Sequence, residues 1–346
     1  MSLTRISSTI LTTLGLLLTM GIAVSTVSCD QPIKSQEVPS TPDILQVVTT
    51  VSPITSLAEN IGGQKIQLEG IIPEGTNSHT YEPAPSVAQI LSKADIIIMN
   101  GLFLEQPSLE MAKEAKKKNA VILQLGDNAI TQAEWIYDFS FPESTGHPNP
   151  HLWTDPLLAL KYAELILEAF VAQDPDNANY YQTNFNLLQS RIKLFDDAVQ
   201  KAIATIPPNN RKLLTYHDSF PYFSTRYGFT VIGAVQPSDF REPSAREVVN
   251  LIKQINLHQV PAIFGSEVFP SDIMEQIAQE SGAIFVEGLR DDDLPGSAGD
   301  IDHTYLGLMV SDINIIVTSL GGTLEALEGF DSSLVFDGPS SAIYPE

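Results

Sequence analysis

The sequence predicts an α/β fold of two lobes, each with a parallel sheet flanked by helices, joined by a long rigid linker helix. Short apolar runs alternate with amphipathic stretches over residues 45–125 and again over 212–289. This alternation is typical of parallel sheets covered by helices. Residues 156–206 carry a nearly continuous helical pattern between the two halves. A length of 346 residues also favours two domains over one.

The N-terminus is predicted to be a targeting segment, a signal peptide over residues 1–29. Arg5 is followed by an apolar run at 14–24 and by small residues before Cys29, the single cysteine of the chain. This arrangement resembles the lipobox of bacterial lipoproteins, although Thr26 stands where leucine is usual. Ordinary signal cleavage with an incidental cysteine is the alternative. Residues 30–43 contain three prolines and few large apolar side chains, which predicts a flexible tether.

The first lobe is expected over residues 44–155. Strands are predicted at 45–51, 66–72, 95–100 and 120–125, and helices at 52–60, 85–92 and 108–118. A long loop over 128–150 follows. Asp155 before Pro156 is typical of a helix N-cap with proline at the first helical position. Helices at 156–173 and 178–206 then form the predicted linker, which is stiffer than a Gly/Ser linker.

The second lobe is expected over residues 207–322. Strands are predicted at 212–216, 230–235, 260–265 and 283–289, and helices at 219–227, 245–257, 271–282 and 303–320, with Ser271 as an N-cap. The tail over 323–346 is acidic and contains a Gly-Pro-Ser-Ser stretch. We expect that tail to be partly disordered.

Charge excludes one class of partner. The net charge of -23 and a pI near 4.4 leave no basic stripe that could neutralise phosphates, so nucleic acid is not an expected partner. The only basic run, residues 116–118, is predicted to be a solvated helix end. No run beyond the N-terminus is long enough to cross a bilayer, so the chain after the tether is expected to be soluble.

Four polar stretches stand out, at residues 78–81, 149–153, 216–218 and 291–293. Each contains a potential metal ligand. Three follow closely on predicted strands, and the second is reached through the long loop. Because loops at the carboxyl ends of parallel strands converge on one crevice, and two stretches lie in each half, a site between the lobes is predicted.

These stretches read SHTYEPAPS from Ser78, NPHLWTDP from Asn149, YHDSFPYFSTRYGF from Tyr216 and DDDLPGSAGDIDHTYLGLM from Asp291. In this order and at these intervals they resemble the bacterial zinc- and manganese-binding lipoproteins of ABC importers, whose two lobes are joined by a rigid helix. The resemblance covers residues 45–320.

The resemblance implies His79, His151, His217 and Asp292 as metal ligands. Asp292 is chosen by its place in the D-x-L pattern, and its two neighbours in the acidic run remain possible. The chemistry agrees, because imidazoles suit first-row transition metals and a carboxylate partly neutralises a divalent ion. Such a shell is close to tetrahedral for zinc, with Zn–N distances of about 2.0 to 2.1 Å.

Other residues near these motifs are not expected to be metal ligands. His147 is expected to be an exposed loop residue, because two prolines separate it from His151 and exclude a helical pair. Glu267 either holds a histidine N–H near the metal or is a helix-start carboxylate. The following are expected to have structural roles: Tyr81, Trp153, His258 and His303.

The cargo implied by the resemblance is zinc, with manganese or iron as alternatives. In this family a glutamate at the position of His217 tends to accompany manganese, so histidine favours zinc. The His-rich loop of many zinc-specific members is missing, and members with three histidines and an aspartate occur in both selectivity groups. Zinc should bind more tightly than manganese in vitro whatever the cargo in the cell.

The predicted function is high-affinity capture of a divalent transition metal ion and its delivery to an ABC permease and its ATPase. The protein is expected to be exported, anchored to the membrane only through lipidated Cys29, and monomeric. A secreted zinc hydrolase is the alternative class, but no His-Glu-x-x-His motif occurs and four protein ligands fill the predicted shell, so no enzyme is predicted. A cell-adhesion protein with a structural metal is a third hypothesis.

Overall fold

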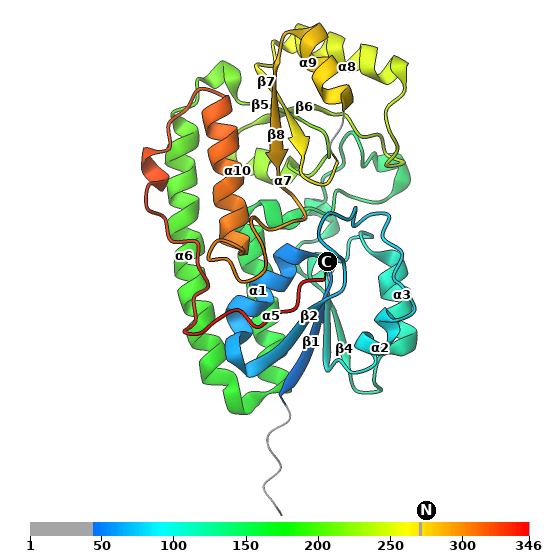
Figure 1. Cartoon of the computed structure of the whole chain (residues 1–346), viewed down its shortest axis with the longest axis vertical. Coiled ribbons are helices and arrows are strands. Elements are labelled where there is room, and N and C mark those ends of the chain that lie inside the picture. Colours follow the sequence, from blue (N-terminus) through cyan, green and yellow to red (C-terminus); the bar gives the residue numbers. More distant parts are fainter. Residues whose placement is uncertain (1–43, 270–271, 346) are drawn as a thin grey trace, which may run out of the picture. The chain divides into compact units, whose positions relative to one another are not determined.

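Two parallel four-stranded sheets form the framework of the computed structural model, with strand orders β2-β1-β3-β4 and β6-β5-β7-β8 (Figure 1). The structure describes residues 44–269 and 272–345. The first sheet consists of β1 Leu45–Thr49, β2 Ile66–Gly70, β3 Ile96–Met99 and β4 Val121–Gln124. The second consists of β5 Lys212–Thr215, β6 Thr230–Ala234, β7 Ala262–Ser266 and β8 Ile284–Leu289. The predicted signal peptide, Cys29, the tether and Ser271 lie outside the described residues.

Helices flank both sheets, as the sequence predicts. In the N-terminal half they are α1 Ser52–Gly62, α2 Val87–Leu91, α3 Gln106–Ala115 and α4 Leu125–Ala129; then follow α5 Pro156–Gln173 and α6 Ala178–Ala204. In the C-terminal half they are α7 Pro221–Tyr227, α8 Ala245–His258, α9 Asp272–Ser281 and α10 Tyr305–Ser319. All predicted strands and helices are present, with small shifts at their ends. The short helix α4 was not predicted.

The strand sequences explain the parallel arrangement. β3 consists of Ile96, Ile97, Ile98 and Met99, all of them buried, which is what a strand covered on both faces requires. It pairs in parallel with β1 and β4. The polar loops after β2, β5 and β8 therefore leave from the carboxyl ends of their strands, as the site prediction requires.

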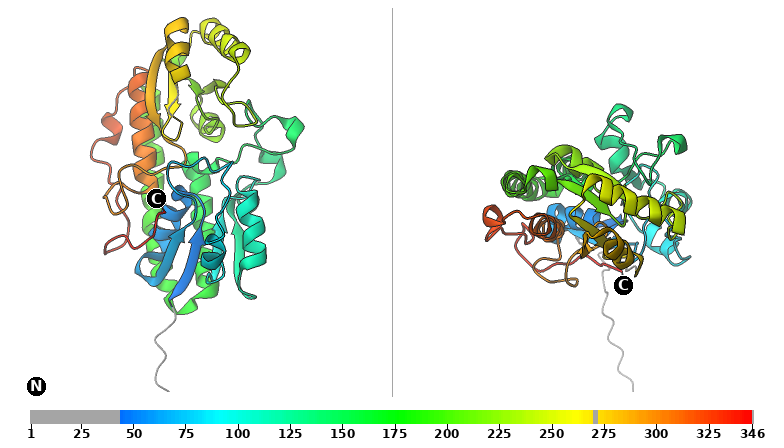
Figure 2. Two further views of the ribbon diagram at one scale, coloured as in Figure 1. Left: turned by 45° about the vertical axis from the view of Figure 1, so that its right-hand side comes forward. Right: turned by 90° about the horizontal axis from the view of Figure 1, so that it is seen from above.

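The predicted helical linker is α5 followed by α6. Asp155 caps α5 by accepting a hydrogen bond from the Leu157 amide, with proline next in the chain, as predicted. α6 is 27 residues long and lies beside α10 (Figures 1 and 2). Side chains of both linker helices, including Phe170 and Phe195, belong to the same apolar core as β1 and α10. This continuous packing makes the linker rigid. No helix in the described part of the chain is long and apolar enough to span a membrane.

The prediction of a partly disordered tail is wrong for residues 323–345. The tail runs along α6 and α10 and reaches the edge of the first sheet (Figure 1). There Ile343 forms a parallel bridge with Glu69 of β2. The buried Glu59 of α1 accepts hydrogen bonds from the Ser340 hydroxyl at 2.6 Å and from the backbone amides of residues 341 and 342. The Tyr344 hydroxyl lies 3.2 Å from the other Glu59 oxygen.

Replacing Glu59 by alanine is expected to detach the tail and destabilise the fold by about 2 to 3 kcal/mol, because several buried hydrogen bonds to a carboxylate are lost together. Thermal melting measures the loss, and limited proteolysis should show faster cleavage within residues 323–345. The matched control replaces Glu110, an exposed glutamate of α3, by alanine. Equal protease resistance in the two variants would contradict the prediction.

Candidate metal centre

Three of the predicted ligands meet at one point. The Nε2 atoms of His79 and His151 lie 3.2 Å apart, those of His79 and His217 3.2 Å, and those of His151 and His217 3.1 Å. Nitrogens bound tetrahedrally to one zinc ion at about 2.0 to 2.1 Å are separated by roughly 3.3 Å. The triangle of nitrogens is therefore the size that a shared metal ion requires.

Hydrogen bonds on the far side of two rings fix which nitrogen carries the proton. His151 Nδ1 lies 2.8 Å from Asn149 Oδ1, and His217 Nδ1 lies 2.6 Å from Gln236 Oε1. An amide oxygen only accepts, so each Nδ1 carries hydrogen and each Nε2 presents a lone pair. Two lone pairs facing each other at 3.1 Å repel unless a cation lies between them. This arrangement is the outer support that metal-binding histidines commonly have.

The three histidines come from separate parts of the fold. His79 lies in the loop after β2, and His217 lies two residues beyond the end of β5. His151 ends the long loop, just before a 3-10 turn over Leu152–Thr154 that leads into α5. Asn149 Oδ1 also accepts the His151 backbone amide, which orients the ring from two directions. The strand-end rule thus correctly placed His79 and His217 at one crevice.

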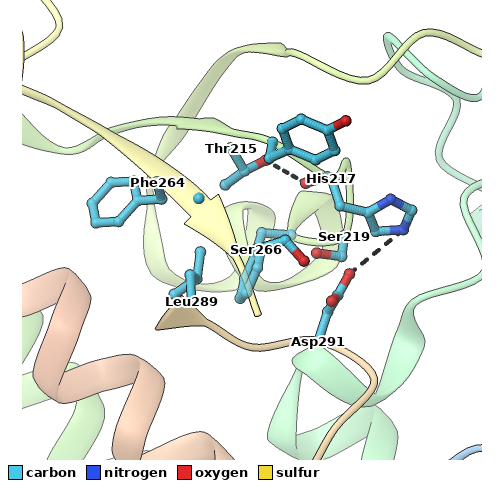
Figure 3. Close-up of a pocket in the computed structure, with 10 residues that line it drawn as sticks. Thr215, His217, Ser219, Phe264, Ser266, Leu289 and Asp291 are labelled. Atoms are coloured by element: carbon cyan, nitrogen blue, oxygen red, sulfur yellow. Dashed lines mark hydrogen bonds and ion pairs between the residues drawn. The ribbon is translucent and has the colours of Figure 1, made fainter. Parts of the chain in front are cut away.

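Two carboxylates of the acidic loop after β8 reach the same centre. Asp291 Oδ2 lies 3.5 Å from His217 Nε2, and Figure 3 shows the two groups facing each other. Oxygens of Asp291 and Asp292 lie within 4.8 Å of a His151 nitrogen and of one another. Asp292 Oδ2 accepts a hydrogen bond from the Ser78 hydroxyl at 2.6 Å. Within the described residues, Asp291 Oδ2 and Asp292 Oδ1 are buried without a hydrogen-bond partner, which leaves both free to bind a cation.

Asp293 and Glu267 hold the backbone of the acidic loop in place and are not among the proposed metal ligands. Asp293 Oδ2 accepts the Gly75 amide at 2.6 Å, which ties the acidic loop to the loop of His79. Glu267 Oε1 accepts the backbone amides of Asp291, Asp292 and Asp293 at 2.9, 3.3 and 3.3 Å. The hypothesis that Glu267 holds a histidine N–H is therefore wrong, because its carboxylate is committed to these amides. It supports the carboxylates instead.

Burial adjusts the proton affinity of every group in the centre. It lowers the pKa of His79 and His151 well below the usual value and that of His217 to about 4. It raises the pKa of Asp291 well above its usual value and that of Asp292 to about 7, with repulsion from the Glu267 carboxylate as a further cause. At neutral pH the imidazoles are thus already in the form that binds metal, whereas the Asp292 carboxyl is about half protonated.

Metal binding is therefore expected to release a proton from the aspartates and not from the histidines. At pH 6 the Asp292 carboxyl is largely protonated, so this group should give up about one proton per zinc ion bound, and its share should disappear near pH 9. Calorimetric titrations in buffers of different ionisation enthalpy count the protons. An Asp292→Asn variant should release fewer, and an unchanged count in that variant would refute the assignment.

The same shifts set the stability of the metal-free protein. Because the folded-state pKa of Asp292 is raised, the folded state binds more protons than the unfolded chain, and stability falls as pH rises through about 7. The lowered pKa of His217 acts in the opposite direction, removing stability as pH falls from about 6.5 to 4. Above about pH 6.5 the His217 effect is absent, and metal bound to Asp292 should abolish the contribution of that carboxyl group to the pH dependence of stability.

Other residues near the motifs lie around the histidine cluster without being proposed as ligands. His147 is exposed, as predicted, and its ring stacks on Phe103 at 4.1 Å between ring centroids, outside the three-histidine cluster. The buried Trp153 donates from Nε1 to the Asp291 carbonyl oxygen at 2.8 Å, so its packing role also holds the acidic loop. The structure also gives roles around the ligands to residues to which the sequence reasoning assigned none: Ser78, Phe141, Asn149, Gln236 and Phe240.

The chain is similar to known metal-binding proteins over most of its length. A family model described as zinc-uptake complex component A, periplasmic (ZnuA) matches residues 47–319. The manganese-binding lipoprotein MntA of Halalkalibacterium halodurans is 27% identical over 279 residues, covering 80% of this chain and 88% of the relative. The iron-binding protein YfeA of Yersinia pestis is 28% identical over 276 residues, covering 80% of this chain and 86% of the relative.

A solved structure agrees with the fold. The periplasmic zinc-binding protein TroA from Treponema pallidum superposes with a TM-score of 0.73 at 26% identity, covering 80% of this chain and 99% of that chain. The stretch matched by the family model ends at residue 319, before the tail that packs on Glu59.

Proposed function

The chain belongs to the family of periplasmic zinc-uptake complex component A, and from this premise we propose that it captures zinc for an ABC importer. The family consists of metal-binding transport proteins rather than enzymes. The observation that carries the proposal is the triangle of Nε2 atoms, 3.1 to 3.2 Å apart, in which two lone pairs face each other without a proton between them. A divalent cation resolves that repulsion.

The proposed ligands are His79, His151, His217 and Asp292, with Asp291 as a second carboxylate facing the ion. Three neutral imidazoles and two carboxylates around a divalent ion make a complex with no net charge. Neutrality matters because an uncompensated charge in a buried site is expensive to desolvate. The Ser78 hydroxyl on one oxygen of Asp292 orients the other oxygen, as outer groups around metal ligands do.

Zinc is the cargo that this donor set supports best. Imidazole nitrogens favour zinc over manganese, which prefers oxygen ligands and more of them. The names of the relatives span manganese, iron and zinc, so the choice depends on the shell in this chain. Iron and manganese remain the competing cargoes.

The proposed place of action is outside the cytoplasmic membrane. The chain would be exported, anchored through a lipid on Cys29, and monomeric, and it would present the ion to a permease driven by an ATPase. Release to the permease requires that docking favours a conformation in which the ion is bound less well. The rigid α6 implies that small movements of the loops, rather than wide opening of the lobes, accompany release.

The test is a metal titration of the chain from Asp30 onward, purified without added metal and treated with a chelator. Zinc is expected to bind reversibly at one equivalent, to raise the melting temperature, and to outcompete manganese and iron(II). Saturable binding of manganese alone would replace zinc as the cargo and leave the transport role in place. No saturable binding of any of the three ions would overturn the proposal.

A further inference from the structure

We propose that Phe240 closes the metal site: its ring orients His79 and excludes water, and thereby sets how fast the ion exchanges and how strongly zinc is preferred to manganese. The inference rests on the proposed function and goes beyond it, because Phe240 is neither a ligand nor part of the four polar stretches.

The first observation is the stacking of Phe240 on a proposed ligand. The Phe240 and His79 rings are nearly parallel, 15° apart in plane angle, with centroids separated by 4.5 Å. Phe141 lies beside both, 5.4 Å from His79 and 6.0 Å from Phe240 between centroids. The two phenylalanines therefore cover the part of the histidine cluster that the acidic loop leaves uncovered.

The second observation explains why His79 needs this contact. His151 and His217 are each held by an amide oxygen on Nδ1. Across residues 44–269 and 272–345, His79 Nδ1 makes no hydrogen bond, and only the backbone amide of His79 is held, by Asn77 Oδ1 at 3.0 Å. His79 is also the one histidine of the three that is not fully buried. Stacking on Phe240 thus takes the place of the missing hydrogen bond in fixing the ring.

The third observation is the backbone of Phe240, whose φ of 56° lies in the left-handed region that a bulky residue rarely adopts. Strained backbone of this kind persists where surrounding contacts impose it and is enriched at functional sites. Here the Phe240 amide donates to the Pro237 carbonyl at 2.9 Å, and Gln236 Nε2 donates to the Phe240 carbonyl at 3.4 Å. The same Gln236 accepts from His217 Nδ1, so one side chain holds both a ligand and the covering ring.

The fourth observation is a passage to solvent at this position. A cavity of about 100 Å³ is lined by His79, Phe141 and Phe240 together with the exposed His147. It is large enough for a few water molecules, each of which takes roughly 30 Å³ in the liquid. His79 and Phe240 both line this cavity, so the stacked Phe240 ring covers one face of the histidine at a place that water can reach.

Selectivity follows from the exclusion of water. Zinc is satisfied by four or five protein ligands, whereas manganese usually retains oxygen ligands including water. The Phe240 ring, stacked on His79 beside this cavity, limits the approach of water to an ion held by the histidines. Removal of the ring should admit water and accelerate the exchange of zinc. It should also reduce the ratio of zinc affinity to manganese affinity.

The experiment compares the full chain with Phe240→Ala, Phe240→Trp and the control Phe139→Ala, which removes an exposed phenylalanine nearby in the fold. Zinc transfer to a chromophoric chelator is followed by stopped flow. Cobalt(II) absorption reports coordination, because four-coordinate cobalt absorbs visible light far more strongly than cobalt with added water. Affinities for zinc and manganese are measured by competition.

Phe240→Ala is expected to release zinc at least tenfold faster, to weaken the visible absorption of bound cobalt, and to narrow the ratio of zinc to manganese affinity. Phe240→Trp should restore all three, and Phe139→Ala should match the parent. Parent-like exchange and cobalt spectra in a folded Phe240→Ala protein would overturn the role of Phe240 while leaving zinc capture intact. If the parent itself binds no metal, the proposed function fails as well, and the two failures are thereby distinguished.

Discussion

Replacing His217 by alanine is expected to weaken zinc binding more than 100-fold while leaving the fold intact. Groups that only support a ligand are typically worth 10- to 100-fold in metal affinity, so loss of a ligand should exceed that range. The Nε2 atom of His217 also lies close to ligand atoms of both remaining histidines and of Asp291, so its removal opens one coordination position in a closely packed shell. Competition with a chromophoric chelator measures the affinity.

Thermal melting gives an independent readout of the same change. At a fixed zinc concentration far above the dissociation constant, a 100-fold weaker affinity removes about 2.7 kcal/mol of ligand stabilisation. The zinc-dependent rise in melting temperature should therefore shrink or vanish in His217→Ala. The control is His147→Ala, since His147 lies on the exposed passage outside the cluster. Equal loss of affinity in both variants would show that the cluster is not the zinc site.

The resemblance of the four motifs implied the proposed ligands, and strand ends account for where their loops lie. His217 lies two residues beyond the end of β5, and the acidic run begins two residues beyond the end of β8. The role of Asn149 could have been predicted as well. Its side-chain amide lies two residues before His151 in the same motif, and its Oδ1 accepts a hydrogen bond from His151 Nδ1. The D-x-L pattern favoured Asp292, whereas the approach of Asp291 to the same centre and the hydrogen bond from Ser78, more than two hundred residues away, depend on side-chain directions that the sequence does not give.

The covering aromatic residues were not predictable for a different reason. Phe240 lies beyond β6 in a stretch with no metal ligand, and its role depends on contact with His79 in the other lobe. The position of Gln236 was a weak indication of function, since it lies just past the carboxyl end of β6, where functional side chains gather.

The order of the C-terminal tail was not predicted from its composition. Its acidic, proline-containing sequence suggested disorder, whereas the buried Glu59 accepts hydrogen bonds from the tail backbone.

Replacing Glu267 by alanine is expected to weaken zinc affinity by about 10- to 100-fold although every ligand remains. Its carboxylate is the acceptor for three consecutive backbone amides, and it fixes the path of the loop that carries Asp291 and Asp292. Without it those amides turn to water, and the loop must be ordered when the ion binds. The conformational entropy lost when the loop becomes ordered makes the free energy of zinc binding less favourable. Glu287→Ala, an exposed glutamate on β8, is the matched control.

A Glu267→Gln variant separates the two effects of this side chain. The amide oxygen can still accept the loop amides, so affinity should stay close to that of the parent. The negative charge, however, is gone, and its repulsion helps to raise the pKa of Asp292. The pKa of Asp292 should therefore fall, and zinc binding should release its proton over a lower pH range. Should Glu267→Gln lose as much affinity as Glu267→Ala, the charge of Glu267 rather than its hold on the loop amides would be its contribution.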